Sequence, residues 1–68
     1  MKIVLNGVAR EAADSTTISS LLEEVGLNPD RVVVEVNLQI IDRHDFKGTF
    51  LKEGDQVEVI GFVGGGII

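Results

Sequence analysis

One stretch with helical periodicity, set among segments with strand patterning, constrains this 68-residue chain most. Four apolar residues follow the spacing i, i+3, i+4, i+7 of a single helix face: Ile18, Leu21, Leu22 and Val25. The polar cluster at 14–17 supplies capping side chains before them, and Gly26 suits the left-handed position that ends a helix. Because one amphipathic helix cannot bury its own apolar stripe, the rest of the chain must supply a matching face.

The segments around the helix indicate strands. Residues 3–5 alternate between two faces, and Asn6-Gly7 is the dipeptide of a type I′ hairpin turn, so we expect a return strand over 8–12. The β-branched run at 32–36 is the clearest internal strand. The first element is therefore a hairpin, and the helix separates it from the later strands.

Turn signals divide the second half of the chain. We expect a turn at Leu38-Gln39, a short strand at Ile40-Ile41, and a polar loop over 42–48 anchored by Phe46. The cluster 52–55 predicts a further turn before a last strand, in which Val57 and Val59 alternate with polar residues.

This order of elements predicts an α+β domain in two layers, a mixed sheet of four or five strands packed on one main helix. A crossover helix between the first hairpin and the later strands would make the first and last strands parallel neighbours at the centre of the sheet. This is the β-grasp, or ubiquitin-like, arrangement. We expect it to span 1–63, followed by a flexible glycine-rich tail over 64–68.

The chain ends with three consecutive glycines, Gly64, Gly65 and Gly66, followed by Ile67 and Ile68. Glycines add no side chain to a core, and they lose the most backbone entropy when they become ordered. They do form a slender backbone that can enter a narrow channel and present a carboxylate to another protein's active site. A frayed terminus without function is the plain alternative.

Composition excludes several classes of function. The chain has no cysteine, so it has neither a thiolate metal site nor a cysteine nucleophile. Its net charge of −5, without a cluster of Lys or Arg, argues against nucleic acid and favours a basic docking face on a protein partner. The apolar runs are too short to cross a membrane, and the start lacks a signal-peptide pattern, so we expect a cytoplasmic protein.

Several segments, taken with the glycine end, resemble the ThiS family of sulfur carriers in thiamine biosynthesis. They are, in order, residues 3–7, 17–22, 36–41 with Arg43 and Phe46 following, and 52–57. The most specific feature is the Gly54-Asp55 turn, which stands one strand's length before a glycine pair near the C-terminus. The position of Phe46 is often Trp in that family, which is a conservative departure. The resemblance covers nearly the whole chain.

The resemblance implies a chemistry for the tail. In ThiS-like proteins a ThiF-type partner adenylates the terminal glycine carboxylate with ATP, and a sulfur donor protein then converts it to a thiocarboxylate. The carrier gives its sulfur to a ThiG-type thiazole synthase and is not itself an enzyme. We therefore expect no bound cofactor, ATP being used by the activating partner.

Ile67 and Ile68 depart from the family pattern, because such carriers normally finish at Gly-Gly. The sulfur-carrying carboxylate must then belong to Gly66, which is an amide to Ile67 in this chain. We expect a processing peptidase to remove both isoleucines, leaving Gly64, Gly65 and Gly66 to enter the partners' active sites. Activation of Ile68 itself is less favoured, since a β-branched residue fits poorly in a channel shaped for glycine.

Other polar residues have simpler explanations. His44 is the only histidine and lies in a polar loop without a second ligand nearby, so we expect it to be solvated. Glu23-Glu24, Glu53 and Asp55 suit exposed helix and turn positions better than acid–base or metal chemistry. We predict no catalytic residue and no metal site.

Two other classes of protein remain open. A MoaD-like small subunit of molybdopterin synthase would share the glycine chemistry, so the identity of the partner separates it from a ThiS-like carrier. A TGS-like binding module of the same fold would not need the tail. Deletion of residues 65–68 would leave such a module's binding intact and would abolish either carrier function.

Overall fold

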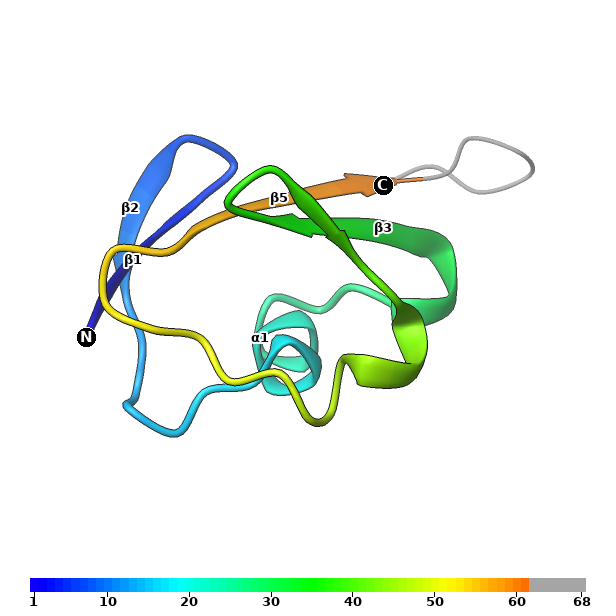
Figure 1. Cartoon of the computed structure of the whole chain (residues 1–68), viewed down its shortest axis with the longest axis horizontal. Coiled ribbons are helices and arrows are strands. Elements are labelled where there is room, and N and C mark those ends of the chain that lie inside the picture. Colours follow the sequence, from blue (N-terminus) through cyan, green and yellow to red (C-terminus); the bar gives the residue numbers. More distant parts are fainter. Residues whose placement is uncertain (62–68) are drawn as a thin grey trace.

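The computed structural model describes residues 1–61, which form a five-stranded mixed sheet with one α-helix against one face (Figure 1). The elements are β1 (Lys2–Leu5), β2 (Val8–Glu11), α1 (Ile18–Glu24), the 3-10 turn η1 (Pro29–Arg31), β3 (Val32–Val36), β4 (Gln39–Ile41), the 3-10 turn η2 (Arg43–Asp45) and β5 (Gln56–Gly61). The predicted α+β class is confirmed. The predicted boundary between domain and tail, after residue 63, lies outside the described residues.

The strand order in the sheet is β2-β1-β5-β3-β4, so the last strand lies at the centre. β1 and β5 are parallel, with Val4 opposite Gln56 and Leu5 opposite Val57. All other neighbouring strands are antiparallel. The first and last strands are thus parallel neighbours, as the sequence predicted for a β-grasp.

Local sequence signals set the first turn and the helix. Asn6 and Gly7 have φ angles of 49° and 82°, which closes the β1–β2 hairpin with the predicted two-residue turn. Thr17 and Ser20 form a reciprocal capping box, in which the Ser20 backbone N–H donates to Thr17 Oγ1 at 3.1 Å. Gly26, with φ of 77°, follows the helix in the left-handed conformation expected of it.

The turn between β3 and β4 lies one residue earlier than predicted. Asn37 and Leu38 form it, with φ angles of 51° and 71°, and Gln39 already belongs to β4. The predicted turn at Leu38-Gln39 is therefore wrong by one position. The two 3-10 turns were also not predicted, although Asn28 and Asp42 each cap one of them.

The core lies between the helix and the facing side of the sheet. Nine apolar side chains are buried there: Ile3, Ile18, Leu21, Leu22, Val32, Val34, Phe46, Leu51 and Val57. Phe46 is 3% exposed, which confirms it as the anchor of its loop. Within residues 1–61, no helix has the length and apolar character that crossing a membrane requires.

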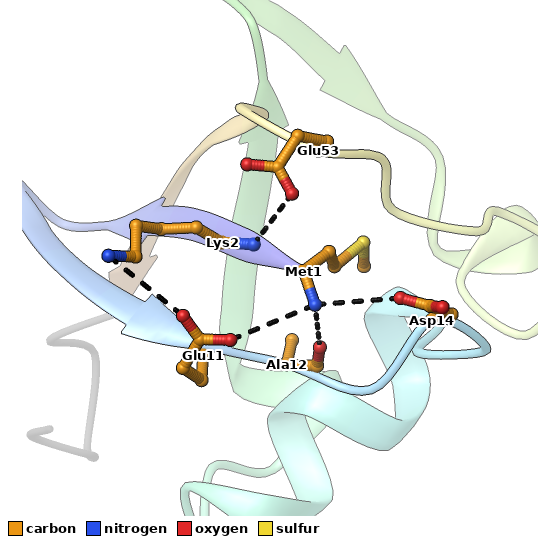
Figure 2. Close-up of polar contacts among 6 residues, drawn as sticks. All are labelled: Met1, Lys2, Glu11, Ala12, Asp14 and Glu53. Atoms are coloured by element: carbon orange, nitrogen blue, oxygen red, sulfur yellow. Dashed lines mark hydrogen bonds and ion pairs between the residues drawn. The ribbon is translucent and has the colours of Figure 1, made fainter.

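Polar contacts join the start of β1 to its surroundings (Figure 2). The amino group of Met1 donates to the carbonyl of Ala12 at 2.7 Å, and the Lys2 backbone N–H donates to Glu53 Oε1 at 3.0 Å. The Lys2 ammonium lies 3.9 Å from Glu11 Oε2 across the β1–β2 pair. The contact with Glu53 connects the first strand with the turn that precedes β5, and the other two connect it with the end of β2.

Candidate functional site

The predicted site residues Gly64, Gly65 and Gly66, and the extension Ile67-Ile68, lie outside the described residues. The structure does show the strand that leads to them. β5 pairs with β3 over five residue pairs, and its last residue, Gly61, lies opposite Val32. Gly61 precedes Gly66 by five residues in the sequence.

Asn6 supports β5 where its neighbour β1 has ended. The last β1–β5 pair is Leu5 with Val57, so the second half of β5 has no strand on that side. The Asn6 backbone N–H donates to the Val57 carbonyl at 2.9 Å. Asn6 Oδ1 then accepts a 2.8 Å hydrogen bond from the Val59 backbone N–H. One turn residue thereby satisfies β5 groups that a longer β1 would otherwise pair.

Asn37 and Asp55 fix the start of β5. Asn37 Nδ2 donates to Asp55 Oδ1 at 3.0 Å, and Asn37 Oδ1 accepts from the Gln56 backbone N–H at 3.0 Å. Asp55 Oδ2 accepts from the Lys52 backbone N–H at 2.8 Å. Asp55 therefore closes its own turn and ties that turn to the β3–β4 hairpin. The Gly54-Asp55 motif is structural, since Gly54 takes a φ of 83° and Asp55 bonds within the protein.

His44 is solvent-exposed, in agreement with the sequence interpretation. Its Nδ1 lies 2.9 Å from Asp42 Oδ1, and its backbone N–H donates to the same oxygen at 2.9 Å. The hydrogen bonds from the His44 backbone and ring lower the pKa of the Asp42 carboxyl from its ordinary value of 3.8. This pair caps a 3-10 turn, which is a structural role.

Of the four acidic residues considered as candidate ligands, Glu23, Glu24 and Glu53 are exposed as expected, whereas Asp55 is half-buried in its turn. Glu24 Oε1 lies 3.3 Å from Arg10 Nη2 in an ion pair between α1 and β2. Glu53 accepts from the Lys2 backbone, and Glu23 is exposed on the helix. Among residues 1–61, no three His, Asp or Glu side chains are grouped to hold a metal ion.

Comparison with known proteins decides the family. The sequence profile of the ThiS family matches residues 3–66, which is almost the whole chain. The chain belongs to the ThiS family. The resemblance seen in the sequence is confirmed, and the profile's match includes the three glycines.

Individual relatives agree with the family assignment. The crystal structure of a ThiS thiamine biosynthesis protein from Geobacter metallireducens superposes with a TM-score of 0.84 at 33% identity, over 97% of this chain and all of that one. The sulfur carrier protein ThiS of Escherichia coli is 27% identical over 97% of this chain and its own full length. The β-grasp fold is thereby confirmed.

A further relative is much longer. The thiazole synthase of Magnetococcus marinus is 42% identical over 66 residues, which are 97% of this chain but only 20% of that protein. The chain thus spans about a fifth of the length of this relative.

Proposed function

We propose that this chain carries sulfur for thiazole formation in thiamine biosynthesis, with the carboxylate of Gly66 as the carrying group. Membership of the ThiS family over residues 3–66 is the observation that carries the proposal. The position of β5 adds support, because this central strand ends at Gly61 and the glycine run begins three residues later in the sequence, at Gly64. In this proposal the partners bind the folded domain, and the slender tail enters their active sites.

The chemistry requires activation of the carboxylate by a partner. A ThiF-like adenylyltransferase joins the Gly66 carboxylate to the AMP of ATP and releases pyrophosphate. Sulfide delivered by a sulfur donor protein then attacks the acyl adenylate and displaces AMP, which leaves a thiocarboxylate on Gly66. Glycines suit this role, since a tail without side chains can enter a closed active site and place its terminal atoms at the reacting centre. The carrier is a co-substrate, catalyses no step and holds no cofactor.

Gly66 needs a free carboxylate for this reaction. In the given chain it is bonded to Ile67, so the proposal includes hydrolysis of the Gly66–Ile67 peptide bond by a peptidase. Gly64 and Gly65 would then form the narrow part of the tail. This step makes the uncut chain a precursor that cannot accept sulfur.

The relatives favour the thiamine pathway over a molybdopterin role. Two proteins named thiazole synthase contain a segment 38% and 42% identical to this chain. A carrier-like segment inside a thiazole synthase supports a ThiG-like enzyme as the acceptor of the sulfur. Neither the molybdopterin-synthase alternative nor the plain binding module has comparable support among these relatives.

The proposal can be tested with three forms of the chain, which comprise residues 1–68, 1–66 and 1–64. Each is mixed with a purified ThiF-like adenylyltransferase. The assay is carrier-dependent exchange of labelled pyrophosphate into ATP. We expect exchange with 1–66, and none with 1–68 or 1–64. Equal thermal stability of the three forms would show that the domain is unchanged. Exchange by 1–68 equal to that of 1–66 would refute the requirement for processing, and an inert 1–66 would refute adenylation at Gly66.

A further inference from the structure

The asparagines of this chain differ in how easily their side-chain amides can react with the backbone. The backbone nitrogen of the following residue can attack the amide carbon Cγ, which closes a succinimide ring and releases the amide nitrogen as ammonia. The attack needs a neighbour that carries an N–H and does not crowd the approach. The chain has three asparagines, all of them exposed: Asn6, Asn28 and Asn37. Exposure therefore does not separate them, and the neighbouring residue does.

Two of the three asparagines have neighbours that hinder this reaction. Pro29 follows Asn28, and proline has no N–H to give up. Leu38 follows Asn37, and its branched side chain crowds the attacking nitrogen. Hydrogen bonds of 3.0 Å also hold both ends of the Asn37 side-chain amide. These features leave Asn6 as the reactive asparagine.

Gly7 leaves the approach to Asn6 open. Gly7 is exposed, and empty space surrounds the position that a Cβ would take. Within residues 1–61, no backbone carbonyl accepts a hydrogen bond from the Gly7 N–H. Hydroxide can therefore remove the proton from this nitrogen, and the attack on Cγ breaks no backbone hydrogen bond.

Rotation of one peptide unit brings the reacting atoms together. The φ angles of Asn6 and Gly7 are both positive, at 49° and 82°, as in a type I′ turn. A type II′ turn keeps the positive φ of its first central residue and has a ψ of about −120° there. At that ψ the Asn6 Cβ and the Gly7 nitrogen eclipse each other about the Cα–C bond, as they must in the ring. Glycine accepts the negative φ of the second position equally well, so the hairpin reaches the reactive geometry without opening.

The same side chain holds β5. Asn6 Oδ1 accepts the 2.8 Å hydrogen bond from the Val59 backbone N–H, beyond the last β1–β5 pair. Water opens the succinimide ring in two ways. Cleavage between the Gly7 nitrogen and Cγ gives aspartate, which keeps an acceptor oxygen in place. Cleavage between that nitrogen and the backbone carbonyl carbon gives isoaspartate, whose main chain runs through Cγ and is longer by one methylene group.

We propose that Asn6 is a site of spontaneous deamidation, and that its isoaspartate product releases the second half of β5 from the β1–β2 turn. The hydrogen bond to Val59 restrains the Asn6 side chain, so the fold slows the reaction without abolishing it. The longer main chain of isoaspartate no longer fits a two-residue turn, and its acceptor oxygen leaves the Val59 N–H. This inference is independent of the proposed carrier function.

The test follows the purified 1–68 chain by mass spectrometry during incubation at mildly alkaline pH. The mass difference between an acid and an amide should accumulate, and peptide mapping should place it at Asn6 and not at Asn28 or Asn37. The rate should rise with pH, because hydroxide removes the Gly7 proton. A linear peptide of residues 2–11 should react faster than the folded chain. Asn6→Gly, which has no side-chain amide, should gain no mass.

Hydrogen exchange of the separated products provides the second readout. The Val59 amide should exchange at least about fivefold faster in the isoaspartate form than in the unmodified chain, because it has lost its acceptor. Freshly purified Asn6→Asp should keep the protection of the unmodified chain. A folded chain that gains no mass while the peptide converts fully would overturn the proposal, as would reaction at Asn37 ahead of Asn6. Unchanged protection of Val59 in the isoaspartate form would overturn the release of β5.

Discussion

The hydrogen bond from the Val59 backbone to Asn6 allows a sharp test of how β5 is held. Asn6→Gly keeps the left-handed turn, because glycine adopts a φ of 49° without strain, but it removes the acceptor 2.8 Å from the Val59 N–H. Loss of one such hydrogen bond destabilises a protein by about 1 kcal/mol. In a domain of this size that lowers the melting temperature by roughly 4–8 °C.

Two measurements follow from that magnitude. Urea unfolding should report the loss in stability, and amide hydrogen exchange of Val59 should become about fivefold faster. Asn6→Asp is the matched control, since it keeps an acceptor oxygen at the same position and tolerates the same backbone conformation. Unchanged protection of Val59 in Asn6→Gly, or equal destabilisation by Asn6→Asp, would refute the role assigned to this side chain.

Two further predictions concern the hydrophobic core and the change in the free energy of unfolding at acidic pH. Leu22→Ala empties a fully buried position and should lower the free energy of unfolding by about 2–5 kcal/mol in urea, whereas Val8→Ala, at a position 67% exposed, should change it by less than about 0.5 kcal/mol. The lowered pKa of Asp42 means that its contribution is complete above its ordinary value of 3.8 and is lost as pH falls through the folded value. The stability difference between wild type and Asp42→Ala should thus stay constant from pH 7 to about 4 and shrink below it, and carboxyl NMR should place the Asp42 midpoint under 3.8.

Much of the fold could be predicted because local and global signals agree. The Asn6-Gly7 turn and the glycine after the helix follow from the backbone angles that those residues allow, and Thr17 caps the helix through its side-chain oxygen. The apolar stripe of the helix then needed one sheet face, and the alternation in the strands supplied it. The resemblance to the ThiS family predicted the same β-grasp fold.

The wrongly predicted turn is one whose position is fixed by contacts between residues that are distant in the sequence. Leu38 takes a φ of 71°, which is uncommon for leucine, so local preferences did not indicate the observed Asn37-Leu38 turn. Asn37 fixes the observed turn through hydrogen bonds to Asp55 and Gln56, which are 18 and 19 residues away in the chain. The two 3-10 turns had local signals, such as Pro29 after Asn28, that could have revealed them.

The candidate site was predictable in its chemistry but not in its surroundings. The glycines and their family define the carrying group. That Glu35 stands opposite Glu58 could be known only from the register of β3 against β5, since periodicity shows which face a residue occupies and not which residue stands opposite.

The intact mass of the protein isolated from its own cells, grown under demand for thiamine, tests the central claim most directly. The account predicts a chain that has lost Ile67 and Ile68, with a fraction in which one oxygen of the Gly66 carboxylate is replaced by sulfur. Fragmentation of the C-terminal peptide would locate that sulfur. A mass that retains both isoleucines in cells actively making thiamine would contradict Gly66 as the sulfur-carrying end.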